Sequence, residues 1–454
     1  MAFGLSSLET KAAYSLATIF AIRMLGLFMI MPVFALYGAE LVGYSPLWVG
    51  LAIGAYGLTQ AVMQIPMGLA SDRYGRKPVI YFGLLLFVVG SVVAALSDSV
   101  YGVTVGRALQ GMGAISSVVM ALAADLTRDE QRPKVMALIG MFIGIAFAVA
   151  LVAGPILAAQ LYLSGLFWVT AGLAVVAFLL TRFTVPNAIS FAPKGDVVPI
   201  PSRLKALIAD PQLSRLNMGI FSLHLLMTAM FVALPGELVR VGYQPEQHWH
   251  IYLPTLLLSF VLMIPMLIIS AKKRNSRGGV RASQLLLFVS LMGFAFAPEN
   301  LLVVTGIVVF FTGFNYLEAT LPTLIARFAP AGAKGSAMGI YASSQFFGAF
   351  CGGLLGGVVM QFFTPKIVFL VAACLVLLWA VFAWGMSEAG RYRSVTLDVA
   401  ALLTKHDGAV ALAEQLRELP GVKEVTIVAE EGITYLKVDE TFELAPAKAL
   451  LAGS

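Results

Sequence analysis

Twelve apolar runs constrain the fold of this chain more than any other feature of its sequence. Each run has about 20 residues, and a helix of that length spans the roughly 30 Å hydrocarbon core of a bilayer. Backbone groups in lipid must find hydrogen-bond partners within the chain, which favours helices. The runs lie near residues 12–37, 47–70, 78–97, 100–124, 134–160, 165–184, 214–238, 249–271, 281–297, 301–325, 335–361 and 365–386. The sequence therefore predicts an all-α membrane protein with twelve transmembrane helices.

The composition excludes an ordinary soluble protein. The chain is 59% hydrophobic and 12% charged, whereas soluble domains are about 45–50% apolar and about 25% charged. A net charge of +6 would suit a nucleic-acid partner, but the basic residues lie in short loops between apolar runs. We therefore expect them to orient the chain in the membrane, and we expect no nucleic-acid partner. Cys351 and Cys374 lie inside apolar runs and form neither a disulfide framework nor a CxxC metal site.

Loop charge predicts the orientation of the helices. The loops after the second, fourth, eighth and tenth runs carry most of the basic residues, whereas the opposite loops carry Arg240 and Lys366. The first group comprises Arg73, Arg76, Lys77, Arg128, Arg132, Lys134, Lys272, Lys273, Arg274, Arg277, Arg281, Arg327 and Lys334. Lys and Arg accumulate on the cytoplasmic side, so we expect both termini to be cytoplasmic. The first residues lack the pattern of a cleaved signal peptide, and we expect none.

A polar connection rich in proline divides the helices into six plus six. We expect an N-terminal six-helix bundle in residues 1–185, a cytoplasmic linker in 186–213 and a C-terminal six-helix bundle in 214–390. Within the linker, SRLKALIAD begins with an N-cap serine and has one apolar face, which predicts a short helix on the inner membrane surface. RPKVMA and AKGSAMG open the fifth and eleventh runs in similar ways. This similarity indicates that the two halves are repeats of one another.

Residues 391–454 are charged and differ in composition from the rest of the chain. Val395, Leu397 and Val399 alternate with polar residues, as in a half-buried strand. A helix pattern follows, then two strand patterns around a tight turn at 430–432, and a last short helix. This order predicts a small soluble α+β ferredoxin-like domain. It resembles heavy-metal-associated domains, but the loop that carries CxxC in those domains reads TKHDG here, so we expect no metal site and a solvated His406.

A charged turn, GLASDRYGRKP at residues 68–78, joins the second and third runs. Its glycines permit a tight turn, and its opposite charges can pair where a short loop meets water. By itself the turn fits a basic anchor on the cytoplasmic side. It also fits the pattern G-x-x-x-D-R-x-G-R-K, and in this respect it resembles the loop signature of the major facilitator superfamily of membrane transporters.

Two further patterns belong to the same resemblance. GRALQGMGA fits the superfamily pattern R-x-x-Q-G-x-G through Arg107 and Gln110. An arginine inside a membrane helix is costly, so Arg107 should face the bundle interior and contact backbone carbonyls, Gln110 or a substrate. The alternative is that Arg107 only ties the fourth helix to the first. Gly154 and Pro155 keep the Gly-Pro pair of an antiporter-associated pattern in the fifth helix, although several of its glycines are Ala or larger here.

The resemblance implies a secondary active transporter in which two six-helix bundles rock about a central site by alternating access. It implies proton-coupled efflux of a small molecule across the bacterial inner membrane, driven by the proton gradient without a cofactor. The implied partners are this substrate, protons and the lipid bilayer, and the expected state is a monomer. Its gating motif comprises Gly68, Asp72, Arg73, Gly75, Arg76, Lys77 and Asp125. Asp72 should lie near the start of the helix at 335–361, and Arg76 should pair with Asp125.

Polar residues inside the runs are candidates for the substrate or proton pathway. Arg23 could meet an anionic substrate or a carboxylate, or only Gln and backbone partners. Glu318 is the most deeply placed carboxylate, and it could exchange a proton or form an inter-helix hydrogen bond. His224 could carry a proton or serve packing. The other candidates are Tyr341 and four amides, Gln60, Gln64, Asn315 and Gln345, and amides fit sugar-like or weakly polar ligands as well as drugs.

A membrane-embedded sensor or scaffold, with the C-terminal domain as its active part, is the alternative function. The sequence contains no HExxH motif, P-loop, nucleophile elbow or Cys-His pair, so we expect no enzyme. Deleting residues 391–454 would discriminate between the two, because a transporter would keep its flux and a sensor would lose its signal.

Overall fold

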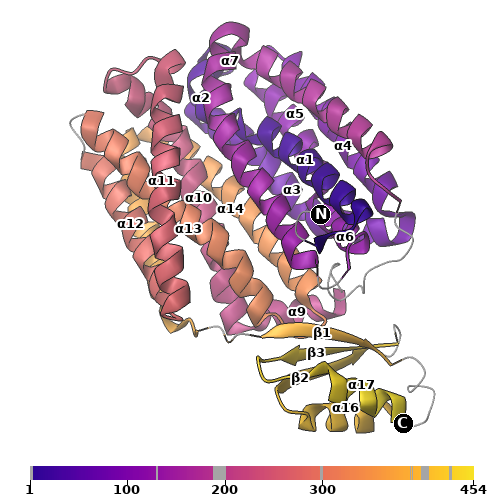
Figure 1. The fold of residues 1–454 in the computed structure, drawn as a ribbon. Coiled ribbons are helices and arrows are strands. Elements are labelled where there is room, and N and C mark those ends of the chain that lie inside the picture. Colours follow the sequence, from indigo (N-terminus) through magenta and orange to yellow (C-terminus); the bar gives the residue numbers. More distant parts are fainter. Residues whose placement is uncertain are drawn as a thin grey trace.

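The computed structural model describes residues 4–128, 131–187, 201–296, 300–388, 390, 392–399, 408–428 and 432–453. The N-terminal half contains α1 (Ser7–Phe28), α2 (Met31–Tyr37), α3 (Pro46–Tyr74), α4 (Arg76–Ala95), α5 (Val100–Met112), α6 (Ser116–Asp125) and α7 (Arg132–Phe183). The C-terminal half contains α9 (Pro201–Ala209), α10 (Pro211–Arg240), α11 (His248–Lys272), α12 (Ser276–Phe296), α13 (Asn300–Phe328), α14 (Lys334–Phe362) and α15 (Pro365–Phe382). Single 3-10 turns are η2 (Gly38–Glu40), η3 (Pro245–Gln247) and η4 (Ala383–Gly385). Figure 1 shows the two halves side by side and the small β-sheet at one end of the bundle.

Eleven helical segments in the described part of the chain are long and apolar enough to cross a membrane. The predicted runs 134–160 and 165–184 both fall within α7, which has 52 residues. A straight helix of that length would measure about 78 Å, more than twice the hydrocarbon thickness. Tyr162, with φ 56° and ψ −171°, departs from helical geometry inside it. The backbone at Tyr162 therefore divides α7 into two parts, each long enough to span a bilayer.

Two predicted runs are broken where the sequence suggested single helices. The first run divides into α1 and α2 around Met29, and the fourth divides into α5 and α6 after Gly113. Gly154 of α7 packs against the Met29 carbonyl so closely that a Cβ at Gly154 would overlap it. Each run still forms one segment long enough to cross a membrane, Ser7–Glu40 and Val100–Asp125, but its helix is interrupted. The breaks matter because they free backbone carbonyls inside the bundle.

The two halves meet closely where α3 crosses α14. Gly50, Gly54 and Gly57 of α3 lie against backbone atoms of Gly353, Phe350 and Phe346 of α14, and a Cβ at any of the three glycines would overlap them. We call this contact the α3–α14 seam. Small residues permit such an approach between membrane helices. The seam brings polar residues of the two halves onto facing helices.

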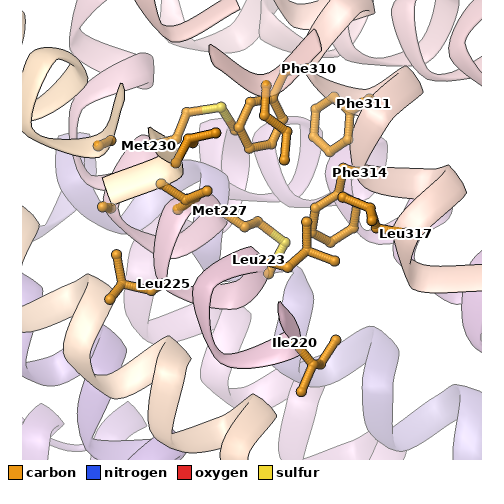
Figure 2. Close-up of a cluster of buried hydrophobic side chains, with 14 of the residues drawn as sticks. Ile220, Leu223, Leu225, Met227, Met230, Phe310, Phe311, Phe314 and Leu317 are labelled. Carbon is orange, nitrogen blue, oxygen red and sulfur yellow. The ribbon is translucent and has the colours of Figure 1, made fainter. Parts of the chain in front are cut away.

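The C-terminal half has an aromatic and methionine-rich core. Figure 2 shows Met227 and Met230 of α10 near Phe310, Phe311, Phe314 and Leu317 of α13. Phe147 of α7 belongs to the same core, with its ring centroid 6.0 Å from that of Phe311 and 6.3 Å from that of Phe314. The N-terminal half therefore inserts an aromatic ring into the core of the other half.

The C-terminal domain has β1 (Arg393–Asp398), α16 (Gly408–Glu418), β2 (Val422–Val428), β3 (Ile433–Val438) and α17 (Leu444–Gly453). The strands form an antiparallel sheet in the order β1-β3-β2. Its core comprises Leu397, Val399, Leu412, Leu416, Val425, Leu436, Val438, Phe442 and Ala447. The sheet faces the membrane helices, and α16 and α17 cover its other side (Figure 1). The predicted order of elements is confirmed, while His406 and most of the TKHDG loop lie outside the described residues.

The linker helix predicted at 202–210 is present as α9. Asp210 ends this helix and caps the next one, because its carboxylate accepts hydrogen bonds from the backbone N–H groups of Gln212 and Leu213 at the start of α10. Residues 188–200 of the linker lie outside the described residues. The part of the linker that is described thus leads directly into the C-terminal half.

Candidate functional site

Arg23 of α1 forms a buried polar cluster in the N-terminal half. Its guanidinium donates to Gln60 Oε1 at 2.7 Å, to the Gly113 carbonyl at 2.8 Å and to Ser116 Oγ at 3.4 Å. The Gly113 carbonyl is one of those freed by the break between α5 and α6. Gln60 also donates to Gln64 Oε1 and to Ser116 Oγ. We call Arg23, Gln60, Gln64 and Ser116 the arginine cluster; its members are 0–8% exposed.

The contacts of Arg23 agree with one of the alternatives that the sequence left open, and a contact with a substrate remains a prediction. Among the described residues, its hydrogen bonds go to an amide, a hydroxyl and a backbone carbonyl, and none goes to a carboxylate. The guanidinium also lies 5.5 Å from the Phe87 ring centroid and 5.9 Å from that of Tyr56. These contacts stabilise a buried cation without a counter-charge. The structure therefore gives Arg23 Gln and backbone partners.

Arg107 of α5 is a second buried arginine in the N-terminal half. It donates to Gln110 Oε1 at 2.9 Å and to the Ala52 carbonyl of α3 at 3.4 Å, and it lies 5.0 Å from the Tyr56 ring centroid. Gln110 in turn donates to Ser91 of α4 at 2.8 Å. The expected contacts with Gln110 and a backbone carbonyl are present. The alternative was that Arg107 ties the fourth predicted helix to the first. This was wrong, because Arg107 contacts α3, which is the second predicted helix.

Glu318 of α13 forms the second polar cluster, in the C-terminal half. Its carboxylate lies 3.2 Å from His224 Nε2 of α10 and accepts a hydrogen bond from Gln345 Nε2 of α14 at 3.2 Å. Gln345 Nε2 also lies 2.7 Å from His224 Nε2. We call these three residues the glutamate cluster. The Glu318 side chain is 40% exposed, whereas that of His224 is 8% exposed, so Glu318 has the more exposed side chain of this pair.

Buried hydroxyl groups near the glutamate cluster have no hydrogen-bond partner among the described residues. They belong to Thr228, one helical turn after His224, and Tyr341, one turn before Gln345. Both side chains are more than nine-tenths buried. Asn315, by contrast, donates to Ser259 of α11 at 3.0 Å and ties α13 to α11. The unpaired hydroxyls leave hydrogen-bonding capacity around Glu318 that a bound molecule could use.

The α3–α14 seam connects the two clusters. Ser343 of α14 donates to the Ala61 carbonyl of α3 at 3.0 Å. Ala61 follows Gln60 of the arginine cluster, and Ser343 lies two residues before Gln345 of the glutamate cluster. The clusters therefore lie at the same crossing point, one in each half.

The predicted pair of Arg76 with Asp125 joins the charged turn to the end of α6. Arg76 Nε lies 2.9 Å from Asp125 Oδ2, and both side chains are buried. Arg76 also contacts Asp72 Oδ1 at 2.6 Å and donates to Ser71 Oγ at 2.8 Å. Asp72 thus contacts its own half in this structure. The pairing of Arg76 with Asp125 ties the start of α4 to the end of α6.

Other residues of the turn shape it or extend its contacts. Gly75 has φ 92°, a left-handed conformation that favours glycine between α3 and α4. The Gly68 carbonyl accepts a hydrogen bond from Ser71 Oγ at 2.6 Å. Lys77 donates to the Val185 carbonyl at 2.7 Å, close to the end of α7. Arg73, by contrast, lies over the ring of its neighbour Tyr74.

Sequence reasoning missed several members of these clusters. Ser71, Ser116 and Thr228 are common small residues that no motif singles out. Ser71 contacts Arg76 within the charged turn and Thr228 follows His224 on α10, whereas only helix packing brings Ser116 beside Arg23. The one signal that the sequence offered was the interruption GMGAISS after Gln110, where glycines precede two serines. Such an interruption can mark a helix break with a free carbonyl.

The chain belongs to the major facilitator superfamily, whose family model matches residues 16–350. It is similar to the "Inner membrane transport protein YajR" of Escherichia coli (strain K12), with 43% identity over 440 residues that cover 95% of this chain and 94% of that protein. The "Multidrug resistance protein MdtH" of Proteus mirabilis (strain HI4320) is 26% identical over 74% of this chain and 83% of that protein.

Solved structures show the same fold. The D-xylose-proton symporter has a TM-score of 0.68 at 14% identity, covering 84% of this chain and 99% of that chain. The human organic anion transporter MFSD10 has a TM-score of 0.62 at 20% identity, covering 83% of this chain and 100% of that chain. The fold and the family together define a membrane transporter.

Proposed function

We propose that this transporter exports a small molecule from the cell in exchange for protons, by alternating access and without a cofactor. Glu318 would be the group that carries the proton. The observation that supports this role is the partly exposed Glu318 side chain, whose carboxylate lies between His224 and Gln345 from two other helices. A carboxylate that contacts neutral or titratable partners can change protonation when its surroundings change.

We propose twelve spans in two six-helix bundles, with α7 counted twice because of its interruption at Tyr162. The bundles would occupy residues 1–185 and 214–390, with the linker 186–213 and the ferredoxin-like domain 391–454 on the cytoplasmic side. Loop charge supports this orientation, with both termini cytoplasmic in the inner membrane. A monomer is sufficient for this arrangement, because both clusters lie within one chain.

We propose that the charged turn acts as a cytoplasmic gate. The α3–α14 seam pairs Gly57 with Phe346 and Ala61 with Ser343, so the two helices run antiparallel. Continuing this register would bring Asp72 level with the beginning of α14, whose N-terminal dipole favours an acid. Protonation of Asp72, or rocking of the halves, would then weaken the contact. Asp72→Asn should increase labelling of cytoplasm-facing cysteines, and unchanged labelling would contradict the gate.

Flux measurements in proteoliposomes test the transport proposal. The probes would be ethidium, xylose and uridine, and a trapped pH dye would report proton movement under an imposed pH gradient. We expect at least one probe to move against its gradient in the unsubstituted protein. Glu318→Gln should abolish gradient-driven movement, because the amide cannot bind and release a proton at this position.

Glu246→Gln provides the matched control for this experiment. Glu246 lies in η3 and is exposed, so the same substitution there should leave proton-driven flux unchanged. Proton-driven flux that persists in Glu318→Gln would contradict the assigned role of Glu318. The absence of flux for a broad set of probes would contradict transport itself.

A further inference from the structure

The chain between α15 and the C-terminal domain is held by the ends of two membrane helices. The Glu388 carboxylate accepts hydrogen bonds from the backbone N–H groups of Ser276 and Arg277, both at 3.0 Å, at the start of α12. An acid at a helix N-terminus is favourable. Gln212 near the start of α10 accepts a hydrogen bond from the Ser387 N–H at 3.0 Å. The C-terminal domain therefore begins only a few residues after a fixed anchor.

The sheet of the C-terminal domain has one face toward its own helices and one toward the membrane helices (Figure 1). Side chains alternate along β3, so Leu436 and Val438 enter the domain core while Tyr435 and Lys437 lie on the opposite face. Tyr435 is nevertheless 0% exposed. Its ring lies against Gly332 in the connection between α13 and α14, where a Cβ would overlap it.

Lys437 makes the second contact with this connection. Its ammonium group donates to the Phe328 carbonyl at 3.4 Å and to the Ala329 carbonyl at 3.1 Å, where α13 ends. A cation at a helix C-terminus is stabilised by the free carbonyls and the helix dipole. Loss of solvent lowers the pKa of Lys437, and Lys334 lowers it further, whereas Glu424 and Asp210 raise it.

The contacted connection joins the two helices that carry most of the glutamate cluster. Glu318 lies ten residues before Phe328 on α13, and Gln345 lies on α14. Ala329, Ala331 and Ala333 within or beside the connection are each 2% exposed. Movement of α13 relative to α14 must therefore either carry the C-terminal domain along or break its contacts with the connection.

We propose that the C-terminal domain is a docked restraint: the face of its sheet that carries Tyr435 and Lys437 binds the α13–α14 connection of the same chain and slows the conformational cycle of the transporter. The domain then regulates transport without binding the substrate. A ligand or protein that covers this face of the sheet would release the restraint. The effect on rate depends on the proposed transport function, whereas the docking does not.

Two substitutions weaken the docking from opposite sides. Gly332→Asn keeps a residue type that tolerates the left-handed backbone at φ 68° while its side chain collides with Tyr435. Lys437→Gln removes the cation from the end of α13 and leaves the domain core unchanged. Gly242→Asn is the control for Gly332→Asn. Gly242 also has a left-handed backbone, and no described atom lies within 4 Å of a Cβ placed on it. Lys448→Gln, at an exposed position in the C-terminal domain, is the control for Lys437→Gln.

Hydrogen exchange of the full-length protein in lipid nanodiscs decides whether the domain is docked. We expect amides in residues 326–338 to exchange about tenfold faster or more in Gly332→Asn and Lys437→Gln, because their local opening becomes easier. Exchange in β2 should not change, which would show that the domain is still folded. Exchange in residues 326–338 equal to that of the two control variants would overturn the docking.

Initial transport rates decide whether docking restrains the cycle. Both docking variants should transport the active probe faster than their controls. If hydrogen exchange in residues 326–338 became faster while the transport rate stayed unchanged or fell, the proposal that docking restrains the cycle would be overturned. No flux in the unsubstituted protein would count against the proposed transport function, whereas the exchange result needs no substrate and would still decide the docking.

Discussion

The arginine cluster and the glutamate cluster differ in how completely their polar groups are paired. Arg23 is 2% exposed and makes three hydrogen bonds; among its donors, only Nε lacks a partner in the described structure. The Glu318 side chain is 40% exposed and lies near two buried hydroxyls that have no partner among the described residues. The arginine cluster is buried and almost fully paired, whereas the glutamate cluster is more exposed and has unpaired hydroxyls beside it.

From this difference we infer a mainly structural role for the arginine cluster and a role in transport for the glutamate cluster. A buried, paired arginine holds α1, α3 and the break between α5 and α6 together, and its removal would leave acceptors without partners. An accessible carboxylate contributes less to folding and can bind a proton or a polar group of a substrate. We therefore expect substitutions in the arginine cluster to affect mainly stability and those in the glutamate cluster to affect mainly transport.

Removal of Arg23 should have the largest effect on stability. Arg23→Met would leave the Gly113 carbonyl and the Gln60 amide oxygen without their donor, at a cost of about 2–4 kcal/mol in the free energy of unfolding. Gln345→Leu in the glutamate cluster should cost less than about 1 kcal/mol. Unfolding with denaturant in mixed micelles measures both. Equal losses, or a transport defect in Arg23→Met without loss of stability, would contradict the structural role.

The α3–α14 seam between the clusters should be the next most sensitive region. In Gly57→Ala, the added Cβ would lie about 2.5 Å from the Phe346 carbonyl oxygen, and such overpacking costs about 1–3 kcal/mol. Gly144→Ala is the control, since a Cβ there has no atom within 4 Å and alanine favours the helix. Thermal unfolding in detergent should show a lower midpoint for Gly57→Ala only. Equal midpoints would argue against close contact of the halves.

Two hydroxyl deletions should have the smallest effects, in opposite directions. Ser116→Ala removes a hydroxyl that accepts hydrogen bonds from Arg23 and Gln60, and it should lower stability by about 1 kcal/mol. Thr228→Val removes a buried hydroxyl that has no partner in the described part of the chain, and it should raise stability or leave it unchanged. The same unfolding assay compares them. Destabilisation by Thr228→Val would show that its hydroxyl is already paired.

Much of the architecture could be predicted from the sequence because lipid imposes simple rules on length, apolarity and loop charge. The same rules predicted a separate C-terminal domain where the composition changes. They did not predict the breaks near Met29 and Gly113, since a broken helix satisfies its backbone through neighbours that are distant in sequence. The Arg23 contact with the Gly113 carbonyl is one such case.

The sequence predicted many residues of the candidate site, but it predicted few of the contacts between them. Arg76 and Asp125 were expected to pair because of the turn motif, and they do. Glu318, His224 and Gln345 were separate candidates, and only the packing of α10, α13 and α14 joins them. Docking of Tyr435 against Gly332 could not be predicted, because it depends on which face of a small sheet meets a loop.

Proton release on binding tests the central claim most directly. The probe that shows flux would be added to purified protein in weakly buffered detergent solution, and the pH change would be recorded. We expect proton release from the unsubstituted protein and from Glu246→Gln, and none from Glu318→Gln. Proton release from Glu318→Gln equal to that of the unsubstituted protein would contradict the assignment of Glu318 as the proton carrier.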